Sequence, residues 1–362
     1  MSTSYPHRID TLLNRFSFNF AKSQVNEVLP LTSRSKEVFK QDILSAVSGN
    51  QALQDRLNEL GLLALQLDTR QVEVFFIRDE ATQLKLTSFL TTFSNTPEKI
   101  ISEAFPFPVE DPVQLGRLKK GMLYPVLSDD VEIARIHYHR MVASTVTDRE
   151  IEEPVPADHL SSEGKKLQRA DTVYMMKRTV RTQLFHVIYW QPETSTLILS
   201  VDKNVLSVAS SQDQLFVLRT FLMTHGIDCG SATDVFHAIE PLYNAADGYI
   251  TRLGHVTTDG NPVRIPLKGK QECLKKDSYH HAGESGGFVH AKFMVEKKWK
   301  FKVDGSVSTV DVEVGLMGHP RMLDTAQPLS DFSVNKVKRL EDFRFAIDKV
   351  LSHIPTSQPE AS

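Results

Sequence analysis

The chain has 362 residues, 41% apolar and 24% charged, a balance typical of a soluble globular protein long enough for two domains. Its formal net charge of −3 excludes a generally basic surface, so any attraction for nucleic acid must be local. Cys229 and Cys273 belong to no CxxC or finger pattern, which argues against disulfides and a cysteine zinc site. Because no apolar run approaches the roughly 20 residues that span a bilayer and no signal-peptide pattern is present, we expect a cytoplasmic protein outside the membrane.

The first half of the chain is expected to be a mainly helical α+β domain, residues 1–150. Apolar side chains recur at helical spacing in residues 38–47 and again in residues 53–60. Residues 72–77 (VEVFFI) have the β-branched and aromatic content of a strand. Residues 131–146 indicate one further strand or two.

A change of composition then marks a domain boundary. Residues 151–168 are acidic and contain proline, and we interpret them as a linker. Residues 169–354 are expected to form an antiparallel sheet packed by two or three helices, followed by a disordered tail at residues 355–362. Within this domain, residues 266–287 have few apolar side chains and are predicted to be a long unstructured loop. The predicted fold class is therefore α+β.

The clearest alternation of apolar and polar side chains lies in residues 286–318. Successive side chains of a strand point to opposite sides, so this pattern predicts one apolar face, which includes Trp299, and one face rich in lysine. Asp304-Gly305 is a two-residue hairpin signal. With that turn, Trp299 is expected to pair with Val310.

Basic side chains are concentrated around this hairpin. Residues 264–302 contain ten Lys and Arg against four Asp and Glu, whereas residues 1–160 contain 17 against 22. Lysines on a strand face and an adjoining loop can follow a phosphate backbone and release its counterions. We predict contacts with nucleic acid, DNA or RNA, from Lys268, Lys270, Lys275, Lys276, Lys292, Lys298, Lys300 and Lys302. The alternative is a solvated face without a ligand.

The triplet Glu296-Lys297-Lys298 resembles the ExK element of metal-dependent nucleases of the (D/E)…ExK type. The resemblance implies that Asp277 and Glu296 hold Mg²⁺ while Lys298 orients the attacking water. In the expected hairpin register Glu296 pairs with Glu313, and facing carboxylates are better tolerated with a cation between them. The candidate Mg²⁺ ligands are therefore Asp277, Glu296 and Glu313. Pairing of the carboxylates with cross-strand lysines is the alternative.

Residues 289–295 (VHAKFMV), followed by Gly-Ser at 305–306, resemble the HxK…GS motif of the phospholipase D family. The resemblance implies that His290 attacks phosphorus and that Lys292 binds the phosphate. The chain departs from the pattern, because the Asp expected beyond the lysine is absent and no second HxK motif occurs. Two half-sites would then have to come from a dimer.

Histidine pairs are further candidates for metal binding. His137 and His139 are two residues apart and share one face of a strand, and His280 and His281 are adjacent. Imidazole is a good ligand for Zn²⁺ and Ni²⁺. No HExxH or Cys-containing set completes either pair, so we predict no native metal site on them.

Nucleic-acid binding through the basic hairpin and loop is the function that the sequence favours. The acidic first half offers a surface for a protein, so we expect action within a larger intracellular assembly. The alternatives are a nuclease, which requires Mg²⁺ as its cofactor, and a scaffold or adaptor without chemistry. Expected partners are nucleic acid and either another protein or a second copy of the chain, and no membrane.

Overall fold

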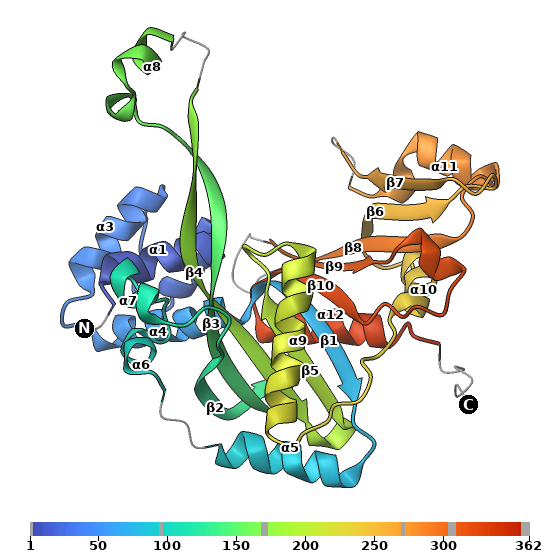
Figure 1. Ribbon diagram of the computed structural model, residues 1–362, viewed down its shortest axis with the longest axis horizontal. Helices are drawn as coiled ribbons and strands as arrows, with labels where there is room; N and C mark the ends of the chain where they lie inside the picture. Colours follow the sequence, from blue (N-terminus) through green and yellow to red (C-terminus); the bar gives the residue numbers. More distant parts are fainter. Residues whose placement is uncertain (1–2, 94–96, 168–172, 269–271, 303–308, 356–362) are drawn as a thin grey trace.

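The computed structural model describes residues 3–93, 97–167, 173–268, 272–302 and 309–355. In these residues, ten antiparallel strands form one sheet in the order β2-β3-β4-β5-β1-β10-β9-β8-β6-β7, with helices around it (Figure 1). The α+β class predicted from the sequence is therefore confirmed. The strands are β1 (Asp68–Phe76), β2 (Tyr124–Ile133), β3 (Ile136–Pro154), β4 (Met175–Gln191), β5 (Thr196–Asp202), β6 (Tyr249–Val256), β7 (Pro262–Pro266), β8 (Lys292–Lys302), β9 (Thr309–Met317) and β10 (Asp331–Val337).

The N-terminal helices begin at capping residues that the sequence supplies. The side chains of Ser4, Ser17, Ser35 and Asn50 each accept a hydrogen bond from a backbone N–H of the first turn of α1 to α4. These four helices bury a common apolar cluster, to which Phe107 and Val310 also contribute. The helices are α1 (Tyr5–Arg15), α2 (Phe18–Val25), α3 (Lys36–Ala46), α4 (Gln51–Gln66), α5 (Glu80–Thr92), α6 (Lys99–Ala104), α7 (Pro112–Arg117), α8 (Ser162–Leu167), α9 (Val208–Thr224), α10 (Ile239–Asn244), α11 (Ser278–Ser285) and α12 (Leu340–Leu351).

The sheet continues across the predicted domain boundary. Strands β1 and β2 lie within residues 1–150, and β3 begins there and continues past residue 150. Strand β3 pairs with β4 as far as Pro154, opposite Met175. The described part of residues 151–168, expected as a linker, forms the end of β3 and then α8, at the tip of a two-stranded ribbon that projects from the body (Figure 1). These residues therefore connect two strands of one sheet rather than two separate sheets. All but the first residue of the predicted tail, 355–362, lies outside the described residues.

The β8–β9 hairpin has the predicted faces but a different register. Trp299 is only 5% exposed, as expected for the apolar face. It pairs with Val312 rather than with Val310, so the predicted register was wrong by two residues. Side chains alternate with a period of two, and a shift by two therefore leaves Trp299 and Lys298 on their expected faces. The turn predicted at residues 304–305 lies outside the described residues.

The segment predicted as an unstructured loop, residues 266–287, contains helical structure. A 3-10 turn at Leu274–Lys276 and helix α11 occupy much of its described part. The Asp277 carboxylate caps α11 by accepting a hydrogen bond from the backbone N–H of His280 at 3.0 Å, and the His280 side chain is buried. The prediction was wrong because a capping residue and a few buried side chains, rather than an apolar stripe, hold this short helix.

Two further expectations concern the cysteines and the membrane. Cys229 and Cys273 are buried and are not joined by a disulfide. Burial raises the pKa of the Cys229 thiol to about 12, so this thiol stays protonated at neutral pH. Across the described ranges, no helix combines the length and apolar character needed to cross a bilayer.

Candidate functional site

Several of the predicted lysines meet in a cavity of about 520 Å³ beside β8. Its walls come from the α10–β6 connection, β6, the 3-10 turn before α11 and β8. We call it the lysine cavity, because its polar lining includes four lysines next to three aromatic rings. These residues are Lys275, Lys276, Lys297, Lys300, Tyr249, Trp299 and Phe301. Three of the eight predicted lysines therefore share one concave surface.

The inner wall of the lysine cavity is held by one carboxylate. Asp247 Oδ2 accepts a hydrogen bond from Trp299 Nε1 at 3.0 Å and lies 2.6 Å from Lys349 Nζ, while Asp247 Oδ1 lies 3.3 Å from Lys297 Nζ. Burial alone would raise the pKa of Asp247, but the bonds from Lys349 and Trp299 and the charge of Lys297 hold it well below its usual value. The carboxylate is therefore ionised, and it fixes both β8 side chains against the α10–β6 connection.

Gly248 lets this connection approach β8 closely. Its φ of +69° lies in the left-handed region, which favours glycine. A Cβ at this position would lie 2.8 Å from the Lys298 carbonyl oxygen and 2.8 Å from Trp299 Nε1. A larger residue would push the wall away from β8 and change the shape of the lysine cavity.

Positive charge exceeds negative charge around the lysine cavity. Lys300 is paired with Glu272, and its ammonium lies 5.4 Å from the centre of the Tyr249 ring. Lys275 lies over the Tyr243 ring at 4.4 Å. In the described part of the chain, neither Lys275 nor Lys276 forms an ion pair. Neither ammonium group has to leave a bound carboxylate before it meets an anionic ligand.

The other predicted lysines are distributed differently. Lys298 lies 3.7 Å from Asp311, across the hairpin. Lys292 Nζ lies 2.9 Å from Glu240 Oε1, so a carboxylate already compensates each of these ammonium groups. Lys268 and Lys302 are exposed and form no ion pair within the described ranges, and Lys270 lies outside those ranges.

Lys292 was expected to share a face with Lys298, and the structure corrects this. The pairing of β6 with β8 shifts between Met294 and Lys292, which marks a bulge. The Lys292 ammonium therefore lies over the ring of Tyr243 on α10, at 4.6 Å, on the side of the sheet to which Lys297 points.

The three carboxylates predicted to bind Mg²⁺ have separate roles. Asp277 caps α11. Glu296 lies 3.3 Å from Arg252 and pairs with Gly315, while Glu313 lies opposite Lys298 and 2.9 Å from Lys336. Burial raises the pKa of Glu296, and the charge of Glu313 adds to this. Arg252 and Lys336 thus provide the positive charge that was expected from a metal ion. Among the described residues, the three carboxylates do not meet as one ligand group.

The residues that resemble the phospholipase D motif are only partly described. His290 is exposed just before β8, and its backbone N–H donates to the Val256 carbonyl oxygen at 3.0 Å. Lys292 is bound to Glu240 and Tyr243, as above. The Gly-Ser pair at 305–306 lies outside the described residues, so the resemblance remains a hypothesis.

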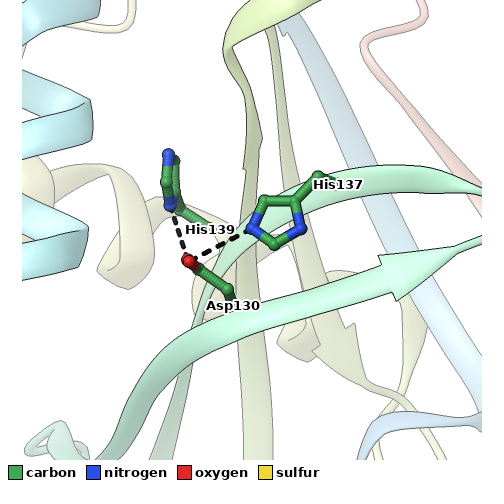
Figure 2. A group of neighbouring side chains, drawn as sticks. All are labelled: Asp130, His137 and His139. Atoms are coloured by element: carbon green, nitrogen blue, oxygen red, sulfur yellow. Dashed lines mark hydrogen bonds and ion pairs between the residues drawn. The ribbon is translucent and has the colours of Figure 1, made fainter.

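A second polar cluster lies near the opposite edge of the sheet, on β2 and β3. Figure 2 shows that Asp130 lies between two imidazoles, with its Oδ1 2.6 Å from His139 Nδ1 and its Oδ2 3.1 Å from His137 Nε2. Hydrogen bonding to His139 and His137 lowers the pKa of Asp130. The ligand atoms all lie within 4.8 Å of one another, and across the described ranges no other three His, Cys, Asp or Glu side chains do so.

The sequence analysis missed several residues of these sites, among them Lys297, Asp247, Tyr249 and Asp130. Lys297 could have been predicted from the sequence, because it interrupts an otherwise apolar strand face and a buried ammonium needs a partner. The role of Asp130 could be predicted only by recognising the tight turn between residues 133 and 136, because this turn sets Asp130 opposite His139.

Comparison with family models and with curated sequences adds no relative for this chain. No protein-family model matches it, and no curated protein has a matching sequence. Its function is therefore inferred from the geometry of its own residues.

Proposed function

We propose that the protein binds single-stranded nucleic acid at the lysine cavity. The observation that carries this proposal is the grouping of four lysines with Tyr249, Trp299 and Phe301 around one concave surface. Lysines that follow the backbone beside rings on which bases stack are the common arrangement for single-strand binding. Phosphates would contact Lys275 and Lys276, which have no carboxylate partner in the described part of the chain, and a base would lie against Tyr249 or Phe301.

The same geometry favours a single strand over a duplex. A cavity of about 520 Å³ has room for an unpaired base, whereas the bases of a duplex are paired and stacked and cannot enter it. The flat face of β8 offers Lys298, whose charge is offset by Asp311. Backbone contacts carry no sequence information, so we expect similar affinity for strands of different sequence.

The test is a salt series with a labelled single-stranded oligonucleotide and with the duplex of the same sequence, measured by fluorescence anisotropy. For a single strand, the slope of log affinity against log salt changes by about 0.7 for each phosphate contact. The double variant Lys275→Ala/Lys276→Ala should therefore bind more weakly and flatten the slope by up to about 1.4. The matched control is Lys119→Ala/Lys120→Ala, which removes the same charge from the loop before β2 and should keep the wild-type slope.

Two results would overturn the proposal. One is an affinity for the single strand that does not depend on salt. The other is a Lys275→Ala/Lys276→Ala variant that behaves like its control. The scaffold interpretation, in which these surfaces bind protein, would then be preferred. Addition of Mg²⁺ to the same samples, followed by electrophoresis, tests the nuclease alternative, because only a nuclease shortens the strand.

A further inference from the structure

We propose that Asp130, His137 and His139 form a binding site for one Zn²⁺ ion. The set of donors, two imidazoles and one carboxylate, is a zinc ligand set. Bonds of about 2.0–2.2 Å place the ligands of a tetrahedral zinc ion roughly 3.4 Å apart. The three ligand atoms already lie within 4.8 Å of one another, so only a small adjustment of the side chains is needed.

The backbone fixes the two imidazoles on one face. His137 and His139 alternate on β3 with Tyr138 and Arg140, which are buried on the other side of the sheet. The Arg140 guanidinium binds Asp129 Oδ1 and Gln66 Oε1, at 2.6 and 2.9 Å. A slip of β3 by one residue would bury both histidines and expose Tyr138 and Arg140, so the register of the imidazoles is strongly set.

The neighbouring strands complete the site. Asp130 on β2 pairs with His139, and Trp190 on β4 pairs with the same histidine from the other side. The Trp190 indole donates to Thr87 Oγ1 at 2.9 Å and is therefore held in place. Residues directly opposite in a sheet share a face, so His139 lies between a carboxylate and a fixed ring.

A further carboxylate lies on the same face of the sheet. Glu132 pairs with His137 and is exposed, so it points to the side on which Asp130 lies. The side chains of His137 and Asp130 are 54% and 51% exposed, so the cluster opens to solvent. The zinc ion would thus be held by three protein ligands, with its remaining position taken by Glu132, by water or by a small anion.

The three side chains contact one another without a metal ion, but these contacts do not explain why two histidines share one carboxylate. Asp130 bridges both imidazoles. A carboxylate needs only one histidine for an ion pair, as in His237 and Asp234, whose atoms lie 3.8 Å apart. At Asp130 two imidazoles converge on one carboxylate from alternate positions of a strand, so three groups of the kind that bind zinc meet on one face.

The experiment titrates metal-free protein with Zn²⁺ by calorimetry and with Co²⁺ by visible absorption, which reports the ligands around the metal. We expect one Zn²⁺ per chain and an absorption band typical of a four-coordinate Co²⁺ ion. Asp130→Asn, His137→Gln and His139→Gln should each weaken binding by about tenfold or more. The matched control His237→Gln removes an exposed histidine of a carboxylate pair and should leave binding unchanged.

Thermal melting without metal checks that each variant is folded. Should His139→Gln unfold, His137→Gln decides, because the His137 side chain is half exposed. Wild-type protein that takes up no Zn²⁺ would overturn the proposal. So would a folded His137→Gln variant that binds Zn²⁺ as tightly as the wild type.

Discussion

Lys297 and Asp247 form a partly buried ion pair that joins β8 to the segment after α10. The Lys297 ammonium lies 3.3 Å from Asp247 Oδ1 and donates to the carbonyl oxygens of Leu242 and Ala245, at 2.8 and 2.9 Å. Burial lowers the pKa of Lys297, and the charge of Asp247 acts against this. The last carbonyl groups of a helix lack partners within the helix and attract cations. Lys297 satisfies two such groups and, at the same time, forms part of the wall of the lysine cavity.

The first prediction concerns this ammonium. Lys297→Met keeps the length of the side chain but leaves the Leu242 and Ala245 carbonyl oxygens without their donor. Removing one partner from a buried polar contact should lower the free energy of unfolding by about 3 kcal/mol. Urea denaturation measures this change.

The control for Lys297→Met is its neighbour on the strand. Lys298 lies on the opposite face, in a partly exposed pair with Asp311. Lys298→Met should cost less than about 1 kcal/mol, since exposed ion pairs contribute little. Equal losses for the two variants would contradict the assigned role of Lys297.

The second prediction separates packing from hydrogen bonding at Trp299. Its ring packs edge-on against Phe345, with centroids 5.5 Å apart, and its Nε1 donates to Asp247. Trp299→Ala should cost about 3–5 kcal/mol through the cavity that it leaves. Trp299→Phe keeps most of the apolar contact but loses a bond to a charged acceptor, and should cost about 2 kcal/mol. Urea denaturation of both variants checks the order, which would be contradicted if the Phe variant were the less stable.

The hairpin shows which part of a fold its sequence can predict. Beyond the bulge near Lys292, the alternation around Trp299 correctly assigned the faces of β8, because a strand faces the core with every second residue. The same alternation cannot fix the register, since a slip by two residues buries the same set of side chains. The pairing of Trp299 with Val312 depends on contacts between strands that no local pattern contains.

The Asp130 cluster was missed for a different reason. The two residues between β2 and β3, Ala134 and Arg135, have φ angles of 51° and 67°. Such turns usually contain Gly, Asn or Asp, which adopt positive φ more readily. Without that signal the sequence showed His137 and His139 but not the strand that brings Asp130 opposite them. The acidic composition of residues 151–168 misled for a similar reason, because the basic side chains that compensate it lie on another strand. Glu152, for example, forms an ion pair with Lys177 of β4 at 3.1 Å.

The third prediction is a loss of stability in acid that comes from His186. This imidazole is fully buried, its Nδ1 accepts from the Asp202 backbone N–H at 3.2 Å, and burial lowers its pKa to about 4. The unfolded chain takes up the proton near pH 6.5, whereas the folded chain resists until about pH 4. Stability should therefore fall as the pH drops from 6.5 toward 4, by about 2 kcal/mol at pH 5 from this group alone.

A variant isolates the contribution of His186 from that of other groups. Glu73 acts in the opposite direction, because burial raises its pKa to about 7, so its contribution to stability falls as the pH rises from about 4.5 to 7. Urea denaturation at several pH values should show a weaker loss in acid for His186→Gln than for the wild type. The exposed His225 supplies the control, and His225→Gln should keep the wild-type pH dependence. Parallel curves for the wild type and His186→Gln would rule out the assigned role.

The fourth prediction distinguishes a helix cap from a metal ligand at Asp277. As the cap of α11, Asp277 needs only a side-chain oxygen that accepts the His280 N–H. Asp277→Ala should therefore cost about 1 kcal/mol, while Asp277→Ser, which keeps such an oxygen, should be close to the wild type. Denaturation in urea with and without Mg²⁺ measures both. If Asp277 were a Mg²⁺ ligand, Mg²⁺ would stabilise the wild type but neither variant. A serine hydroxyl does not replace a carboxylate on this ion. Stabilisation of the wild type alone would return Asp277 to the metal-binding role that its sequence context suggested.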